Sequence, residues 1–400
     1  MMKKLSLVKR ILLCLVLGIA IGLLCGTSNI QLPVRILVTF SGLFANFLSF
    51  IIPLIIIGFI VPSIATLGNK SGKGLLVTTI IAYTSTLIAG FLAYLVGTGL
   101  LPKLINGSVT LSEAGQSIGP YFTIEIPPIM NVMSALTLAF ILGIGLSKIK
   151  NSTMLSVADE FNRIVLMIVT KTIIPIVPIY IGCVFAKLSY SGEIFNTLKS
   201  FGIVYLILFS LQLVYIVFQY CIAGAIKKQN PFKLIKNMIP AYMTAAGTQS
   251  SAATIPVTLE CAKKHEVSED VLEFVIPLGA TIHLAGDTIT LVLTSMAVMY
   301  MNGQTPTFAM IIPFIFMLGV TMVAAPGVPG GGVMAALGLL ESMLGFGGIE
   351  KSIMIALHAA QDSFGTATNV TGDGAIAIIV DRIINKKKDD SKKYEGPIAL

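Results

Sequence analysis

The sequence has few charged residues, and its cysteines form no pattern. Only 12% of its 400 residues are charged and 55% are hydrophobic, with a mean hydropathy of +0.90, whereas soluble domains carry roughly 25% charged residues. The cysteines show no paired or metal-like spacing, so they indicate neither a disulfide framework nor a metal cluster. They are Cys14, Cys25, Cys183, Cys221 and Cys261. The composition excludes an ordinary soluble domain and indicates a polytopic membrane protein.

Apolar runs near the ~20 residues that cross a bilayer recur along the whole chain. They cover residues 11–25, 34–61, 75–101, 132–146, 164–186, 203–225, 274–301, 308–325 and 353–380. The first run follows Lys9 and Arg10 and resembles a signal peptide. However, no small-residue cleavage site leads into a soluble domain, and more apolar runs follow. We therefore expect the first run to form a membrane helix.

Lysine and arginine gather in some loops and are nearly absent from others. Clusters lie at residues 3–10, 70–73, 148–150, 227–236, 263–264 and 386–393, whereas the loops around Ser28, Gly107, Gly192 and Gly303 have few basic residues. By the positive-inside rule, the clusters face the cytoplasm. We expect a multi-pass protein of the plasma membrane with both termini in the cytoplasm.

Two apolar segments do not fit simple crossing. Residues 238–261 have basic clusters at both ends, and residues 308–347 have basic-poor ends, so each must enter and leave the membrane on one side. The sequence therefore predicts an all-α fold of eight transmembrane helices plus two re-entrant helical hairpins. The alternative is that these segments form short ordinary helices or lie on the membrane surface.

Small residues, hydroxyls, glycines and prolines occur at the predicted hairpin tips, residues 247–256 and 325–332. Each hairpin precedes a span with polar residues at its centre, near residues 279–287 and 362–373, and we expect both spans to be broken there. Two such units entering from opposite sides form an inverted repeat, in which substrate and ions bind at the membrane midplane.

Four motifs in this order resemble the dicarboxylate/amino acid:cation symporter family of glutamate and aspartate transporters. They are residues 248–258, 277–282, 327–332 and 369–373. The resemblance implies a secondary active symporter, not an enzyme, that works as a homotrimer by elevator-type alternating access. It also implies a scaffold of residues 1–70 and 121–198, a transport domain of residues 71–120 and 199–385, and a basic cytoplasmic tail of residues 386–400. The expected partners are a small amino acid and membrane lipid, with no nucleic acid.

The resemblance also implies roles for individual residues. Asp362 corresponds to the carboxylate that binds the substrate's α-amino group, and the Asp373 carboxylate to a ligand of co-transported Na⁺. The implied substrate site comprises Gln249, Ser250, Ser251, Asp287, Val328, Gly332, Asp362, Gly365, Thr366 and Asn369. One implied sodium site joins Asp373 to carbonyls of Gly279, His283 and Asn369, and a second uses carbonyls of Thr281, Met322, Val323 and Ala325. The alternative for Asp362 is a buried hydrogen bond between helices.

The departures from the family pattern bear on the substrate. Gly365 and Gln249 stand where acidic-substrate members carry an arginine, and Asp287 replaces a threonine near the acidic side chain. A neutral amino acid, small or hydroxyl-bearing, is therefore expected. The alternative is an acidic amino acid or dicarboxylate symporter. An unpaired Asp287 would be costly, so it should be protonated, paired with His283 or bonded to the substrate.

Histidines leave the coupling ion open. His283 and Ala285 replace ligands of the family's third sodium site, so protons could replace or supplement Na⁺, with His283 and Asp287 as candidate carriers. The alternative for His283 is a neutral imidazole bonded to unwound backbone. His358 is expected to fill a polar gap or to be a second proton site, and His265 to be solvated in a charged loop.

Two rival functions also place polar residues within a membrane. An intramembrane hydrolase could use His358 with Asp362 or Ser363, but no third orienting group or nucleophile motif accompanies them. A channel would explain polar breaks, but it needs no carboxylate for an amino group. Neither rival explains the inverted hairpins as well as a symporter does.

Overall fold

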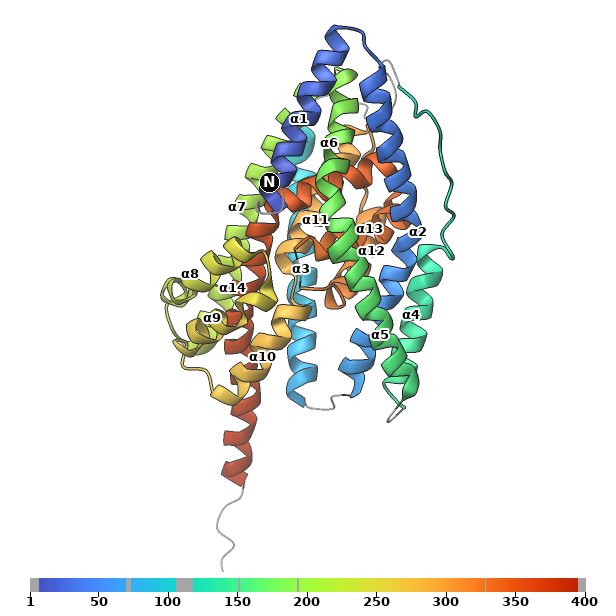
Figure 1. Cartoon of the computed structure of the whole chain (residues 1–400). Helices are drawn as coiled ribbons and strands as arrows, with labels where there is room; N and C mark the ends of the chain where they lie inside the picture. Colours follow the sequence, from blue (N-terminus) through green and yellow to red (C-terminus); the bar gives the residue numbers. More distant parts are fainter. Residues whose placement is uncertain are drawn as a thin grey trace, which may run out of the picture.

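The computed structural model of the chain (Figure 1) describes residues 7–69, 73–105, 118–149, 152–192, 194–327 and 329–394. All regular secondary structure in these ranges is helical. Helices are the expected outcome for long apolar runs, because each helix satisfies its backbone hydrogen bonds internally where no water is present. Val328 and the last part of the predicted tail, residues 395–400, lie outside the described residues.

The first half of the chain supplies long helices. They are α1 (Leu7–Thr27), α2 (Leu32–Asn69), α3 (Lys73–Leu104), α4 (Val132–Leu146), α5 (Thr153–Ile168), α6 (Ile174–Tyr190) and α7 (Ile194–Lys227), with the π-helical turn Val169–Ile173 joining α5 to α6. α1 packs along α6, as Figure 1 shows near the N-terminus. Glycines allow this approach, because a Cβ on Gly18 would lie 2.1 Å from the carbonyl oxygen of Gly182.

The second half contains two pairs of shorter helices that follow each other in the sequence, and the first pair is joined by a tight turn at Gln249 and Ser250. The helices are α8 (Pro231–Thr248), α9 (Ser251–Lys263), α10 (Glu269–Ile282), α11 (Ala285–Met301), α12 (Phe308–Val323), α13 (Gly331–Leu344) and α14 (Gly348–Tyr394). α8 packs on α9 and α12 packs on α13. Both pairs fall where the sequence predicts hairpins, while their re-entry into a membrane stays a prediction.

The break predicted near residues 279–287 is confirmed, and the break predicted near residues 362–373 is wrong. α10 ends at Ile282 and α11 begins at Ala285, and the residues between them have non-helical backbone, with φ −107° and ψ 92° at His283. In contrast, α14 runs without interruption through its glycines and polar residues. Those glycines serve close packing instead: a Cβ on Gly372 would lie 2.6 Å from Cε1 of His283.

Among the described residues, six helical stretches are long and apolar enough to cross a membrane. They are Lys9–Thr27, Leu32–Ala65, Gly74–Leu104, Thr153–Tyr190, Thr197–Lys227 and Glu269–Met301. Within the last of these, which contains α10 and α11, the apolar window that qualifies it as a possible span is completely buried. The architecture is thus an all-helical, multi-pass membrane protein, and the numbers of crossings and hairpins stay predictions.

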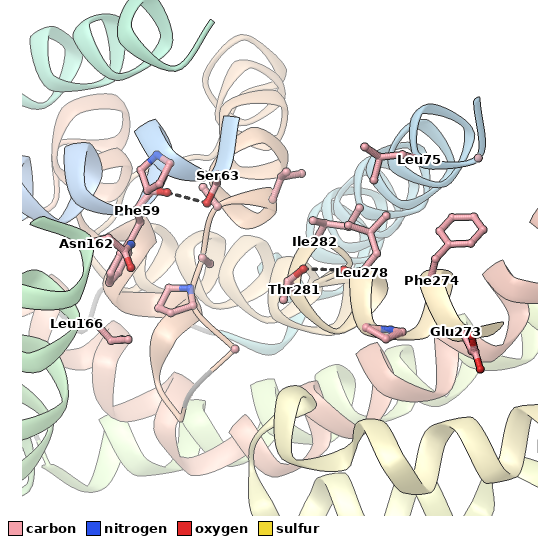
Figure 2. A pocket seen from close by; sticks show the side chains of 18 residues that line it. Phe59, Ser63, Leu75, Asn162, Leu166, Glu273, Phe274, Leu278, Thr281 and Ile282 are labelled. Carbon is pink, nitrogen blue, oxygen red and sulfur yellow. Dashed lines mark hydrogen bonds between the residues drawn. The ribbon is translucent and has the colours of Figure 1, made fainter. Parts of the chain in front are cut away.

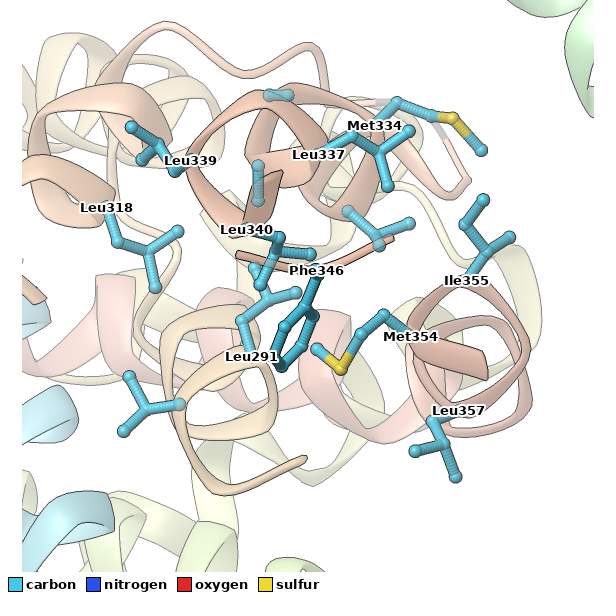
Figure 3. Packing of buried hydrophobic residues seen from close by; sticks show 14 of the residues in the cluster. Leu291, Leu318, Met334, Leu337, Leu339, Leu340, Phe346, Met354, Ile355 and Leu357 are labelled. Atoms are coloured by element: carbon cyan, nitrogen blue, oxygen red, sulfur yellow. The ribbon is translucent and has the colours of Figure 1, made fainter. Parts of the chain in front are cut away.

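Apolar packing places α11 at the centre of the second half. Side chains of α11, α12, α13 and α14 interdigitate around Leu291, Leu340 and Met354 (Figure 3), all of which are 0% exposed. A second cluster joins α8, α9 and α10 to α7 and the later part of α14. These two apolar clusters hold the polar first turn of α11 against the polar middle of α14.

Candidate functional site

Asp362 lies on α14 and is only 4% exposed. Its Oδ2 accepts a 2.8 Å hydrogen bond from the backbone N–H of Gly330, and its Oδ1 accepts a 3.4 Å bond from the hydroxyl of Thr366. Because Gly330 precedes α13, the tip of the second hairpin meets α14 at this carboxylate. An ionised carboxylate offers about four acceptor sites, so these two donors leave room for an ammonium group.

Asp287, in the first turn of α11, is held by two side chains of α14. Nε2 of His358 lies 2.7 Å from Oδ1, and Nδ2 of Asn369 donates to Oδ2 at 2.6 Å. The carbonyl of the same Asn369 amide accepts a 2.7 Å bond from the N–H of Gly286. Of the three alternatives for Asp287, pairing with His283 is not the one in the structure, because His358 is its imidazole partner. Whether His358 only fills a polar gap or also carries a proton stays open.

Two carboxylates and one imidazole converge at this point. The ligand atoms of Asp287, His358 and Asp362 all lie within 4.8 Å of one another, and all three residues are buried. Two negative charges this close repel each other, so the group favours an added positive charge. That charge can come from a proton on His358 or from a bound cation.

His283 belongs to a separate polar cluster. Its Nδ1 lies 3.0 Å from Oδ1 of Asp373 on α14, and its Nε2 lies 3.0 Å from the hydroxyl of Ser85 on α3. That hydroxyl is also 2.8 Å from the hydroxyl of Tyr215 and accepts a 2.9 Å bond from Gln219, both on α7. The ring thus binds side chains and not the unwound backbone that we considered as its alternative partner. The sodium site at Asp373 stays a prediction, with an imidazole against its carboxylate.

The side-chain end of the predicted substrate site contains an amide. A Cβ on Gly365 would lie 3.2 Å from Nε2 and 3.4 Å from Oε1 of Gln361. The four arginines of the chain are Arg10, Arg35, Arg163 and Arg382, so none lies between residues 164 and 381, which supply α7 to α13 and the site residues of α14. Arg35 instead stacks on Tyr121, with its guanidinium carbon 4.4 Å from the ring centroid.

The two hairpin tips touch each other beside the site. Gln249 ends α8 with left-handed backbone, φ 54°, and its Nε2 donates a 3.1 Å bond to the hydroxyl of Ser363. The Ser250 hydroxyl donates a 2.9 Å bond to the carbonyl of Gly327, and Ser251 begins α9. The structure thus brings both tips to α14.

Gly332 connects the second hairpin directly to the Asp287 cluster. A Cβ on Gly332 would lie 2.6 Å from Oδ1 of Asp287 and 3.3 Å from Nε2 of His358. Asp287, Gly332, Asp362, Thr366 and Asn369 are therefore gathered at one place, as the sequence predicts. The predicted role of Val328 lies outside the described residues.

A cavity of about 960 Å³ separates α2 and α5 from α10 and the end of α12 (Figure 2). Thr281, Val323 and Ala325 of the second predicted sodium site line it. Met322 is fully buried, and the carbonyl of Gly279 accepts a 2.9 Å bond from the N–H of His283. The lining of the cavity also includes Glu273, Phe274, Gly74 and Leu75. The last two directly follow the predicted cytoplasmic cluster at residues 70–73 in the sequence.

His265 is not solvated, which corrects the expectation from its charged loop. It is 0% exposed, and its Nε2 donates a 3.0 Å bond to the carbonyl of Leu234. Burial lowers the pKa of His265, opposed by the bond to the Leu234 carbonyl, and the charge of Lys227 lowers it further. Because Nδ1 has no partner among the described residues, a second ring proton would be buried without an acceptor.

Sequence reasoning missed several neutral partners of the ionisable residues. Ser85 and Gln219 contact His283, while Gln212 and Gln361 bind each other across α7 and α14. The available signal was the same one that identified the charged residues, namely an isolated polar residue inside an apolar run.

Comparison with known proteins identifies the family. The model of the sodium:dicarboxylate symporter family matches residues 7–383. The chain belongs to this family. It is therefore a membrane transport protein and not an enzyme, which excludes the intramembrane hydrolase considered above.

Similar proteins occur in bacteria and animals. The chain is 29% identical over 355 residues to a serine/threonine transporter SstT of Streptococcus suis, covering 83% of this chain and 94% of the relative. It is 27% identical over 399 residues to a serine/threonine transporter SstT of Acinetobacter baumannii, covering 94% and 97%. An excitatory amino acid transporter of Caenorhabditis elegans is 26% identical over 297 residues, covering 70% and 57%.

Proposed function

We propose that this member of the sodium:dicarboxylate symporter family imports a neutral amino acid, small or hydroxyl-bearing, by secondary active cation symport. The observation that carries the proposal is the buried carboxylate of Asp362, in a part of the chain without arginine. An ammonium group matches Asp362 in charge, and no fixed cation is present for a second carboxylate of the substrate. The two bacterial relatives are serine/threonine transporters, which supports the same substrate class.

The substrate's α-carboxylate would bind on the opposite side from its ammonium group. Ser251 begins α9 at the tip of the first hairpin, and helix N-termini present free backbone N–H groups to anions. On α14, Thr366 contacts Asp362 and Asn369 contacts Asp287. Gln249, Ser250 and Gly332 of the hairpin tips would complete the wall of the site. Ammonium at Asp362 and carboxylate at the tip would orient the side chain toward Gly365 and Asp287.

An acidic substrate would place its second carboxylate near Asp287. Two like charges 4 Å apart repel by about 4 kcal/mol at an effective dielectric constant of 20, which corresponds to a large loss of affinity. The acidic or dicarboxylate alternative requires that His358 and Asp287 share an added proton to remove this repulsion. A neutral substrate needs no such change.

The coupling ion is proposed to be Na⁺, with H⁺ as a replacement or supplement. Asp373 would supply a full negative charge for one sodium ion, together with carbonyls of Gly279, His283 and Asn369. A second ion would use the carbonyls of Thr281, Met322, Val323 and Ala325. His283, which lies against Asp373, and Asp287, which lies against His358, are the candidate proton carriers.

The proposed architecture is a homotrimer in the plasma membrane with both termini in the cytoplasm and elevator-type movement. Residues 1–70 and 121–198 would form the scaffold, and residues 71–120 and 199–385 the transport domain, followed by the basic tail at 386–400. The cavity supports this division because one wall comes from α2 and α5 and the other from α10 and α12. Its position beside the predicted cytoplasmic clusters corresponds to an inward-facing arrangement.

Uptake by proteoliposomes tests the proposal. Serine, threonine, alanine, aspartate and glutamate are compared under a sodium gradient, a proton gradient and neither. We expect accumulation of serine, threonine or alanine against a concentration gradient, which also excludes a channel. If aspartate or glutamate outcompetes these three by tenfold or more, the neutral-substrate proposal is wrong. The double variant Gly365→Arg with Asp287→Thr should shift preference toward aspartate by restoring a cation and removing the repulsion.

A further inference from the structure

Gln361 is a buried amide beside Asp362 on α14. It is 2% exposed, and its Oε1 accepts a 2.9 Å hydrogen bond from Nε2 of Gln212 on α7. Among the described residues, Nε2 of Gln361 has no hydrogen-bond partner. Leaving a buried donor unpaired is unfavourable, and native proteins rarely do so unless water, an ion or a ligand supplies the partner.

The orientation of both amides is determined by a backbone carbonyl. The carbonyl of Gly286 can only accept, and it receives a 2.9 Å bond from the Thr290 hydroxyl. Nε2 of Gln212 lies 3.4 Å from this carbonyl and 3.2 Å from the oxygen of Thr290. Reversing Gln212 would place two carbonyls against each other. Gln212 therefore presents its N–H groups, Gln361 presents its carbonyl to them, and Nε2 of Gln361 is left as the unpaired donor.

The unpaired donor lies at the side-chain end of the proposed site. Nε2 is 3.2 Å from the position that a Cβ on Gly365 would take. The carbonyl of Gly365 packs against Gly286, the residue before Asp287. Gln361 directly precedes the proposed ammonium partner, Asp362, on α14. Glycine at position 365 places no side chain against this donor.

We infer that Gln361 is a specificity-determining residue that donates a hydrogen bond to the side-chain hydroxyl oxygen of a serine or threonine substrate. This inference rests on the proposed function. A hydroxyl accepts from the amide and still has its own proton to donate. Alanine offers no acceptor, so the donor would stay unpaired when alanine is bound, and a site built to bond a hydroxyl discriminates against an analogue that lacks it.

Apparent affinities of serine, threonine and alanine in proteoliposomes test the inference. Gln361→Leu removes the donor and keeps an apolar side chain of comparable size. We expect serine and threonine to lose about tenfold in affinity, which corresponds to the net contribution of one hydrogen bond between neutral groups, while alanine is unchanged. Gly365→Ala should give a smaller loss in the same direction, because its Cβ would crowd Nε2 of Gln361.

Gln219→Leu is the matched control. Gln219 is also a buried glutamine with one unpaired amide atom, but it contacts the His283 cluster. The Gln219→Leu variant can change the overall rate of uptake, but its ratio of serine to alanine affinity should equal that of the parent protein.

The outcomes separate this inference from the proposed function. A parent protein that takes up none of the three amino acids refutes the proposed function and the inference with it. Uptake of serine and alanine by the parent, with an unchanged affinity ratio in Gln361→Leu, overturns the inference alone. If Gln361→Leu does not fold, Gly365→Ala decides: an unchanged ratio overturns the inference, and a reduced ratio supports it.

Discussion

Asp362 is the residue on which amino-acid recognition depends. Asp362→Asn should abolish uptake while the protein stays folded, because an amide cannot balance an ammonium group shielded from water. Radiolabelled uptake and thermal unfolding in detergent measure the two effects. The matched control is Asp159→Asn, an exposed carboxylate on α5, which should transport like the parent. Unchanged uptake and affinity in Asp362→Asn would refute the amino-acid proposal.

Asp373 supplies the full negative charge of the first proposed sodium site. Asp373→Asn should raise the sodium concentration for half-maximal uptake by about tenfold or more, since a hard cation loses its charged ligand. Asp381→Asn is the control, because this carboxylate of α14 binds Ser268 and Asn385 away from His283. The site assignment fails if parent and variant have the same sodium dependence, or if neither depends on sodium.

His265 gives folding stability a pH dependence. Burial lowers its pKa in the folded state, so the unfolded chain binds the proton more readily. Stability should therefore be fully present above the usual histidine pKa and should fall as pH decreases below about 6.5, by at most about 1.4 kcal/mol per pH unit from this group. Thermal unfolding between pH 8 and pH 5 measures this. His265→Gln should lose less stability over that range, and an equal loss would contradict the assignment.

The sequence identified the ionisable residues of the site because such groups are costly at membrane depth. It could not assign their partners. A spacing of four residues places Asp287 one helical turn from His283, but the non-helical backbone at His283 and Leu284 breaks that relation. The two side chains consequently reach different residues of α14, Asp373 and His358.

At the scale of the helices, glycine has two structural roles, helix interruption and close packing, which the sequence alone does not distinguish. Gly279 and Gly286 flank a real break between α10 and α11, whereas Gly365 and Gly372 lie within an unbroken α14. In α14 the missing side chains make room for Gln361 and His283. The prediction of a break at residues 362–373 failed because close packing against another helix favours glycine, as helix interruption also does.

Gly332 tests the contact between the second hairpin and the Asp287 cluster. Gly332→Ala should reduce substrate affinity by about tenfold or more, because its Cβ would lie 2.6 Å from an Asp287 oxygen that His358 also contacts. Gly247→Ala is the control in the first hairpin, where an added Cβ meets nothing within 4 Å. Equal affinities in the two variants would show that the hairpin does not pack on Asp287 when the substrate binds.

At the scale of the whole molecule, apolar runs and loop charges were enough to predict a multi-pass helical protein with paired short helices. They could not predict which surfaces meet. The bond from Ser250 to Gly327 joins tips 77 residues apart, and the cavity between α2, α5 and α10 depends on how separately formed helices dock. Such contacts follow from packing of complete elements and leave no local pattern in the sequence.

The cavity makes a prediction about the sides of the membrane. Ser63 on α2 lines the cavity toward the predicted cytoplasmic end, and Ile124, 53% exposed, lies in the predicted outer segment between α3 and α4. In a background without the five native cysteines, Ser63→Cys should react with a membrane-impermeant maleimide in inside-out vesicles only. Ile124→Cys, the matched control, should react in right-side-out vesicles only. Faster labelling of Ser63→Cys from the outside would refute the proposed orientation of the cavity, while reversed labelling of both would refute the topology itself.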